Sequence, residues 1–137
     1  MSRFVLDTSV AASWFFEDEG GAYSSNVLES LNNVEAFVPS LWPLEIANVL
    51  IIAEQRGRCS EAEAARFIEL LDNLPITIDE DTAHRAMHTT YQLAREFCLT
   101  AYDASYLELA MRLGAPLSTM DRQLADAAQK AGVSIHR

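Results

Sequence analysis

The sequence predicts an α/β fold: a single three-layer α/β/α domain over residues 1–137, with a central, mainly parallel sheet of four to five strands. Three observations support this prediction. A chain of 137 residues has room for one hydrophobic core. Half of its residues are apolar and 22% are charged, which is ordinary for a globular protein. Short strand-like runs alternate with longer helical patterns, and this order builds parallel βαβ units with helices on both faces of one sheet.

In the first half of the chain, local signals bound the expected elements. Asp7 interrupts the first apolar run, and Pro39 stops the second. Pro43 opens a nearly all-apolar helix and Gly57 follows its end, which is the usual asymmetry of helix termini. We expect this helix to be largely buried. The expected elements are strands 3–7 and 35–38, helices 9–16, 22–31 and 43–56, and an acidic turn at 17–21.

In the second half, capping signals bound the helices. Ser60 and Glu63 have the spacing of a capping box. Gly114 and Gly132 follow two further helices, as glycine often does at a helix end. We expect the acidic runs 17–19 and 79–81 to be solvated. The expected elements are helices 60–72, 81–97, 103–113 and 121–131 and strands 75–78, 116–118 and 133–135.

The net charge of −10, from twenty acidic and ten basic residues, argues against a protein that coats nucleic acid through bulk positive charge. Such a chain is expected to attract cations, either metal ions or a basic partner. The longest apolar run, 49–53, is far shorter than the about 20 residues of a membrane span, so no membrane contact is expected. Cys59 and Cys98 lack a CxxC pattern and are expected to be free thiols in a cytoplasmic protein.

Four acidic residues stand out by their positions. Asp7 ends the first strand and Asp121 follows the strand-like run 116–118, so both are expected at the carboxyl edge of the sheet, where such folds bind ligands. Glu45 lies in the apolar helix, where a buried carboxylate is costly unless it is paired, hydrogen-bonded or bound to a metal. Asp103 lies just inside the start of another helix.

Each acid also has an ordinary structural explanation. Asp103 and Asp121 each follow a Thr or Ser by three residues, as in a capping box, and Asp121 also suits an N-cap. Glu45 suits the first turn of a helix, and Asp7 suits a turn. Taken together, however, carboxylates that converge on one edge repel one another unless divalent cations bind them. A ligand set made only of oxygen atoms is typical of Mg²⁺ or Mn²⁺.

Three motifs and one acid carry a resemblance to a known family. They are VLDTSV at 5–10, LTAYDASYLELA at 99–110, LSTMDRQL at 117–124, and Glu45 in the helix after the second strand. In the order, spacing and length of these features, the chain resembles the PIN-domain family, and specifically its small VapC-type toxins. The resemblance implies a PIN-like fold and a Mg²⁺- or Mn²⁺-dependent endoribonuclease that a cognate protein antitoxin holds inactive. It also implies a homodimer.

The residue types agree with this chemistry. Hydrolysis of an RNA phosphodiester bond by two metal ions needs a rigid group of carboxylates and no nucleophilic side chain. We expect Asp7 and Asp103 to be the principal metal ligands. Glu45 and Asp121 are expected to complete this catalytic set, either as ligands or by holding metal-bound waters.

Other residues are expected to assist. Ser9 and Thr119 have hydroxyl groups that can hydrogen-bond a carboxylate or a phosphate oxygen, although a simple turn role for Thr119 stays open. Arg122 is expected to steer the RNA backbone. The antitoxin is expected to place a basic segment beside the acids, with apolar anchors near residues 14–16 and the helix at 43–56. Both of these segments could instead belong to the core.

Several alternatives stay open. A strand-end-aspartate phosphatase of the haloacid dehalogenase type needs a second acid two residues after Asp7, where this chain has Ser9. A phospho-receiver domain needs a lysine on a late strand-end loop, whereas Lys130, the only lysine, lies at a helix end. A non-catalytic acidic interaction module would need no metal. His84 and His88 have the spacing of zinc ligands, but without an evident third ligand they are expected to be surface residues.

Overall fold

The computed structural model describes residues 2–16 and 19–137 and contains a four-stranded sheet in the order β3-β2-β1-β4, in which all neighbouring strands are parallel. The predicted α/β architecture is confirmed. Residues 17 and 18, within the expected acidic turn, lie outside the described residues. The strands are β1 (Arg3–Leu6), β2 (Glu35–Val38), β3 (Ile76–Ile78) and β4 (Leu117–Ser118).

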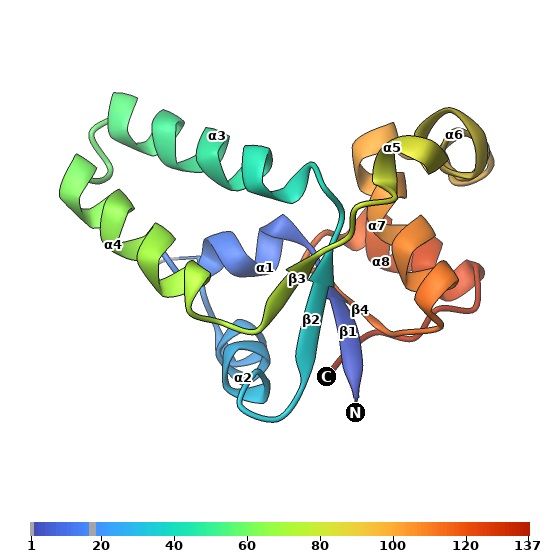
Figure 1. Cartoon of the computed structure of the whole chain (residues 1–137), viewed down its shortest axis with the longest axis horizontal. Coiled ribbons are helices and arrows are strands. Elements are labelled where there is room, and N and C mark those ends of the chain that lie inside the picture. Colours follow the sequence, from blue (N-terminus) through green and yellow to red (C-terminus); the bar gives the residue numbers. More distant parts are fainter. Residues whose placement is uncertain (1, 17–18) are drawn as a thin grey trace.

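Helices cover both faces of the sheet, so the structure has three layers (Figure 1). One layer holds the helices from the first half of the chain, and the other holds those from the second half. The first layer contains α1 (Thr8–Ser13), α2 (Ala22–Ser30), α3 (Trp42–Gln55) and α4 (Glu61–Asp72). The second contains α5 (Thr82–Arg85), the π-helical turn η1 (Ala86–Thr90), α6 (Tyr91–Phe97), α7 (Ala101–Leu113) and α8 (Arg122–Lys130).

The core surrounds β1, one of the two strands with partners on both sides. Phe4, Val5 and Leu6 have no exposed surface, because helices cover both faces of the strand on which they lie. α7 packs directly on β1 and β4, and its Tyr106 and Leu107 are also fully buried. The first strand therefore ends inside the molecule, and the residue after it is held rigidly.

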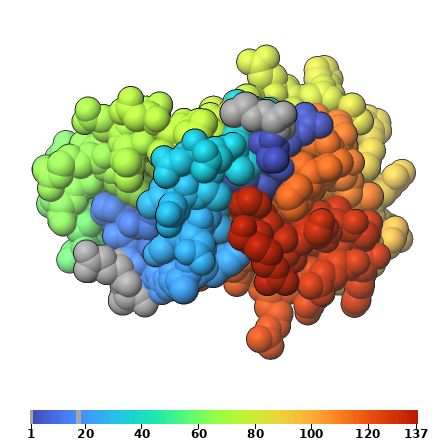
Figure 2. Space-filling model, turned by 90° about the horizontal axis from the view of Figure 1, so that it is seen from below, coloured from blue at the N-terminus to red at the C-terminus, as the bar shows by residue number. Residues whose placement is uncertain are grey.

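The run 133–135, expected as a fifth strand, forms only an isolated parallel bridge between Ile135 and Leu117. β4 is two residues long, so it offers the C-terminal segment too few backbone groups for a longer ladder. Two backbone hydrogen bonds to Leu117 hold the segment, and the ring of His136 stacks on Phe4 with centroids 3.9 Å apart. Figure 2 shows these last residues (red) against α2 (light blue), at the amino-terminal edge of the strands.

The expectation that the helix at 43–56 is largely buried is wrong. Only one stripe of α3, including Ile46 and Leu50, faces the core, while Leu44 is 75% exposed and Ile51 is 49% exposed. A helix on the outside of a layered domain can bury one face, and apolar residues beyond that face remain at the surface. None of the helices in the described part of the chain is long and apolar enough to cross a membrane.

Candidate active site

Four segments bring the four candidate acids to the carboxyl edge of the sheet. Asp7 directly follows β1, and Asp121 stands at the N-cap of α8. Glu45 lies in the first turn of α3, and Asp103 lies in the first turn of α7. This edge is at the top of the sheet in Figure 1, where the chain leaves β2 for α3. The expected convergence of the four residues follows from this topology.

Asp7 is the most enclosed of the four acids, with 6% of its surface exposed. Burial raises the pKa of its carboxyl group above the ordinary value of 3.8, and the charges of Glu45 and Asp121 raise it further. Hydrogen bonds from Ser9 and Thr119 act in the opposite direction, because they stabilise the ionised form. Asp7 is therefore a buried carboxylate that two hydroxyl groups, rather than a basic side chain, keep in place.

Ser9 and Thr119 both hydrogen-bond Asp7, as the sequence predicted for a carboxylate. Each donates its hydroxyl proton to Oδ2 of Asp7, at 2.7 Å in both cases. Each hydroxyl oxygen also accepts a backbone proton from the loop before α8: Ser9 from the N–H of Met120 at 3.0 Å, and Thr119 from that of Asp121 at 3.0 Å. The two hydroxyl groups thus connect the end of β1 to the loop that carries Asp121.

Glu45 is half-buried and is held by two hydroxyl groups that the sequence analysis did not single out. Its Oε1 accepts a hydrogen bond from Thr8 Oγ1 at 3.0 Å and another from the hydroxyl of Tyr106. Tyr106 belongs to α7, three residues after Asp103. A fully buried tyrosine needs a polar partner for its hydroxyl group, and this requirement was the available signal in the sequence.

Asp103 has the clearest electrostatic signature of the site. Burial raises its pKa from 3.8 to about 6, and the charges of Asp7, Asp121 and Glu45 act in the same direction. Its backbone N–H donates to Thr100 Oγ1 at 3.1 Å, so Thr100 is the N-cap of α7. The capping explanation therefore accounts for the backbone of Asp103 but leaves its carboxylate among three other negative charges.

Asp121 does cap a helix, since its Oδ1 accepts the backbone N–H of Leu124 at 3.0 Å. That contact uses one carboxylate oxygen only. Arg122, the next residue, is exposed at the first position of α8. The capping explanation and the site prediction are thus compatible for Asp121, because its second oxygen has no hydrogen-bond donor among the described residues.

The donor set fits a hard divalent cation. In Asp7, Glu45 and Asp121, the hydrogen bonds from described residues all go to one oxygen and leave the other for a ligand. Carboxylate oxygens are the ligands that Mg²⁺ and Mn²⁺ prefer. Within residues 2–16 and 19–137, however, no three Asp, Glu, His or Cys side chains are already arranged as a metal-binding group. The four acids form a coupled cluster rather than a closed ligand shell.

The expectation that the acidic run 79–81 is solvated is wrong for Asp79. Both of its carboxylate oxygens accept hydrogen bonds from Arg112, at 2.7 and 3.0 Å, and its side chain is 14% exposed. Arg112 also pairs with the buried Glu108, at 2.8 Å. The guanidinium of Arg112 is the main reason that the pKa of Asp79 is lowered. This pairing ties the end of β3 to α7, the helix that carries Asp103 and Tyr106.

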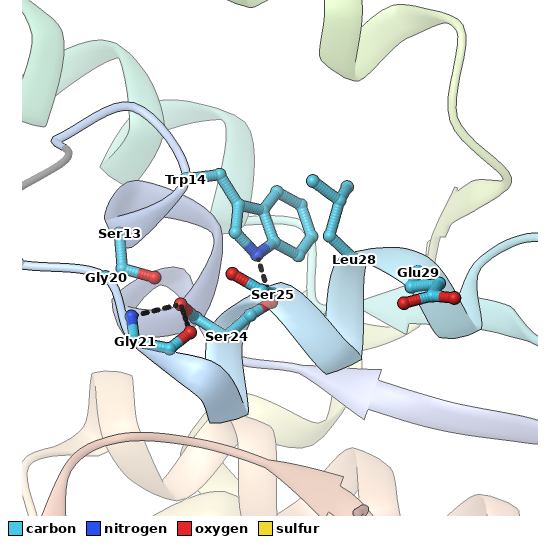
Figure 3. Close-up of a pocket in the computed structure, with 8 residues that line it drawn as sticks. All are labelled: Ser13, Trp14, Gly20, Gly21, Ser24, Ser25, Leu28 and Glu29. Carbon is cyan, nitrogen blue, oxygen red and sulfur yellow. Dashed lines mark hydrogen bonds between the residues drawn. The ribbon is translucent and has the colours of Figure 1, made fainter.

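Two other groups of residues lie apart from the acids. An open pocket of about 560 Å³ lies between α1 and α2, where Trp14 donates its indole proton to the carbonyl of Ser24 at 2.8 Å (Figure 3). None of the four acids lines it. His84 and His88 are exposed, as expected of surface histidines.

Comparison with known proteins finds a matching family profile and two curated relatives. Residues 4–130 match the family profile described as the PIN domain. Ribonuclease VapC3 of Pyrobaculum aerophilum is 27% identical, over 90% of this chain and 93% of its own length. Ribonuclease VapC1 of Mycobacterium tuberculosis is 37% identical, over 72% of this chain and 69% of its own length.

Solved structures show the same fold. The crystal structure of PAE2754 from Pyrobaculum aerophilum superposes with a TM-score of 0.72 at 23% identity, and the match covers 92% of this chain and 84% of that one. The crystal structure of VapBC2 from Rickettsia felis, bound to a DNA fragment from their promoter, superposes with a TM-score of 0.64 at 11% identity. That match covers 98% of this chain and 97% of the other.

Proposed function

The chain belongs to the PIN-domain family, and from this premise we propose that it is a Mg²⁺- or Mn²⁺-dependent endoribonuclease, the toxin of a toxin–antitoxin pair. The relatives it matches along most of its length are ribonucleases by name. The observation that carries the proposal is the coupling of Asp103 to Asp7, Asp121 and Glu45, four carboxylates from four separate segments. Such a group is stable at neutral pH mainly when cations neutralise it.

We propose that Asp7 and Asp103 are the principal metal ligands and that Glu45 and Asp121 complete the set. Held by these carboxylates, divalent ions would activate a water molecule for attack and would offset the charge that develops on the phosphate. Ser9 and Thr119 favour the ionised form of Asp7 and fix its orientation, since both donate to the same oxygen. The chemistry then requires no side-chain nucleophile.

The substrate must approach this site in spite of a net charge of −10. We propose that the bound ions attract the scissile phosphate and that Arg122, exposed beside Asp121, contacts the RNA backbone. Neutralisation of the acids by metal thus serves both binding and chemistry.

The proposed partner is an antitoxin with a basic segment and an apolar anchor. The acids suit the basic segment. A groove of about 250 Å³ between α1 and α3 suits the anchor, because Phe16, Val49, Ile52 and Ala53 line it.

We also propose a homodimer, for which the exposed apolar residues of α3 and α4 offer surface. The proposed location is the cytoplasm, which fits the two free cysteines.

An RNA cleavage assay tests the enzyme proposal. The purified chain is expected to cut RNA in Mg²⁺ or Mn²⁺ and to lose this activity in excess EDTA. Asp7→Asn, purified in the same way, controls for contaminating nuclease and should be inactive in both conditions. Full cleavage in EDTA by the parent, with none by Asp7→Asn, would show a nuclease that needs no metal and would refute the proposed chemistry.

A further inference from the structure

The hydroxyl groups of Tyr106 and Thr8 form a triangle with one oxygen of Glu45. Both contact Oε1, and they lie 2.8 Å from each other. Tyr106 is fully buried and Thr8 is 9% exposed, so water cannot easily replace either contact. The three residues come from α7, α1 and α3, and the triangle joins all three helices at one carboxylate.

The Tyr106 hydroxyl donates to Oε1 of Glu45 and also lies within hydrogen-bond distance of Thr8 Oγ1. With the Glu45 carboxylate as acceptor, two hydroxyl protons serve three oxygen atoms. At least one of these protons must then be donated to Oε1. Tyr106 either donates to Oε1 directly or donates to Thr8, which donates to Oε1 in turn. In each arrangement Oε1 is occupied, and no described residue donates to Oε2.

We propose that Tyr106, together with Thr8, is a positioning residue that fixes Glu45 through Oε1 and so leaves Oε2 for a divalent cation. This inference rests on the proposed function. When a residue that hydrogen-bonds and orients a metal ligand is removed, metal affinity typically falls by about 10- to 100-fold. Tyr106 also links two acids mechanically, because it lies on the same helix as Asp103.

The test is Tyr106→Phe, which removes one oxygen atom and keeps the ring in the core. Mn²⁺ binding is measured by calorimetry, and thermal unfolding is measured in EDTA. The variant is expected to fold and to bind Mn²⁺ about tenfold more weakly or worse. Tyr23→Phe is the matched control, because Tyr23 also makes two hydrogen bonds, to Ser118 and to the carbonyl of His136, but contacts no carboxylate. Its Mn²⁺ affinity should equal that of the parent, whatever the change in its melting temperature.

A double-mutant cycle separates positioning from general packing. Glu45→Gln/Tyr106→Phe is expected to bind Mn²⁺ as Glu45→Gln does, because Tyr106 acts only through Glu45. Additive losses in the cycle, or equal Mn²⁺ affinity of Tyr106→Phe and the parent, would overturn the inference while leaving the proposed function intact. A parent that binds no Mn²⁺ would overturn both. If Tyr106→Phe fails to fold, Thr8→Val carries the same expectation and the same contrary result.

Discussion

Asp103 has a pKa of about 6 in the folded chain, because burial and then the charges of Asp7, Asp121 and Glu45 disfavour its ionised form. The folded state therefore binds this proton more tightly than the unfolded state does. Its contribution to stability is fully present below the ordinary pKa of 3.8 and is lost as the pH rises through about 6. At neutral pH without metal, the charge on Asp103 is thus a cost to folding.

Asp103→Asn should remove this cost. In EDTA at about pH 7.5 the variant is expected to melt at the same temperature as the parent or higher, and the difference should close toward about pH 4. The N-cap contact survives, because it uses the backbone N–H of residue 103. Mg²⁺ should raise the melting temperature of the parent more than that of the variant, and activity should fall by orders of magnitude.

Glu69→Gln removes a charge from the exposed face of α4 and is the control for Asp103→Asn. The difference in melting temperature between Glu69→Gln and the parent should be the same in EDTA and in Mg²⁺. An Asp103→Asn protein that is fully active and responds to Mg²⁺ as the parent does would remove Asp103 from the site and favour the capping explanation.

The positions of the four candidate acids were predictable because each stands at a strand end or a helix start, which local sequence reveals. The contact between Glu45 and Tyr106 was not, because it joins residues 61 apart in the chain. A half-buried Glu and a fully buried Tyr each need a hydrogen-bond partner, but the sequence does not tell that these two residues satisfy each other. For the same reason, the sequence did not predict the pairing of Asp79 with Arg112, and the acidic run 79–81 was expected to be solvated.

At the scale of elements, boundaries were predicted better than exposure. α4 begins at Glu61, after Ser60 of the expected capping box, and α7 ends at Leu113, before Gly114, whose φ of 62° suits glycine. The expected helix at 81–97 is interrupted by the π-helical turn η1, which no local signal in the sequence predicted. Helical periodicity places residues on a face, but it does not tell which faces find a partner, and so the outer side of α3 was misjudged.

Arg112, on α7, pairs with Asp79, the residue that follows β3. Loss of this contact should loosen α7, the helix that carries Asp103 and Tyr106. Arg112→Met keeps the aliphatic stem and leaves Asp79 and Glu108 without their cation. We expect a loss of about 2–3 kcal/mol in the free energy of unfolding, somewhat below the cost of breaking a fully buried pair. Denaturant unfolding at neutral pH measures it.

A matched control for Arg112→Met is Arg85→Met, which breaks the exposed pair with Asp81 and should cost about 0–1 kcal/mol. Because the pKa of Asp79 is lowered on folding, its contribution is present above the ordinary value of 3.8 and is lost as the pH falls below it. The difference between the parent and Arg112→Met should therefore shrink in acid. Equal losses for the two variants would mean that the Arg112 contacts are no stronger than a surface pair.

At the scale of the whole molecule, the acidic cluster and the groove between α1 and α3 are separate surfaces. The four acids lie at the carboxyl edge of the sheet, while the groove combines apolar side chains such as Phe16 and Ile52 with the charged Arg56 and Arg58. A partner that uses both should bind through two physically distinct contacts. Salt screens exposed charge pairs strongly and has little effect on apolar burial, so the two contacts can be told apart.

Ile52→Glu tests the apolar contact with the cognate antitoxin. The added carboxylate would replace an apolar contact and would lose its water in the complex, so affinity for the antitoxin should fall by about tenfold or more, while cleavage of RNA by the free chain is unchanged. Met87→Glu, which alters a residue that is 82% exposed in the other helical layer, should leave the affinity as it is. High salt should lower the antitoxin affinity of the parent and of Ile52→Glu by the same factor, because the basic segment still contacts the acids in both proteins. Titrations at low and high salt measure this factor. If Ile52→Glu binds as tightly as the parent, or if salt has no effect on either protein, the antitoxin engages another surface and the two-contact arrangement is wrong.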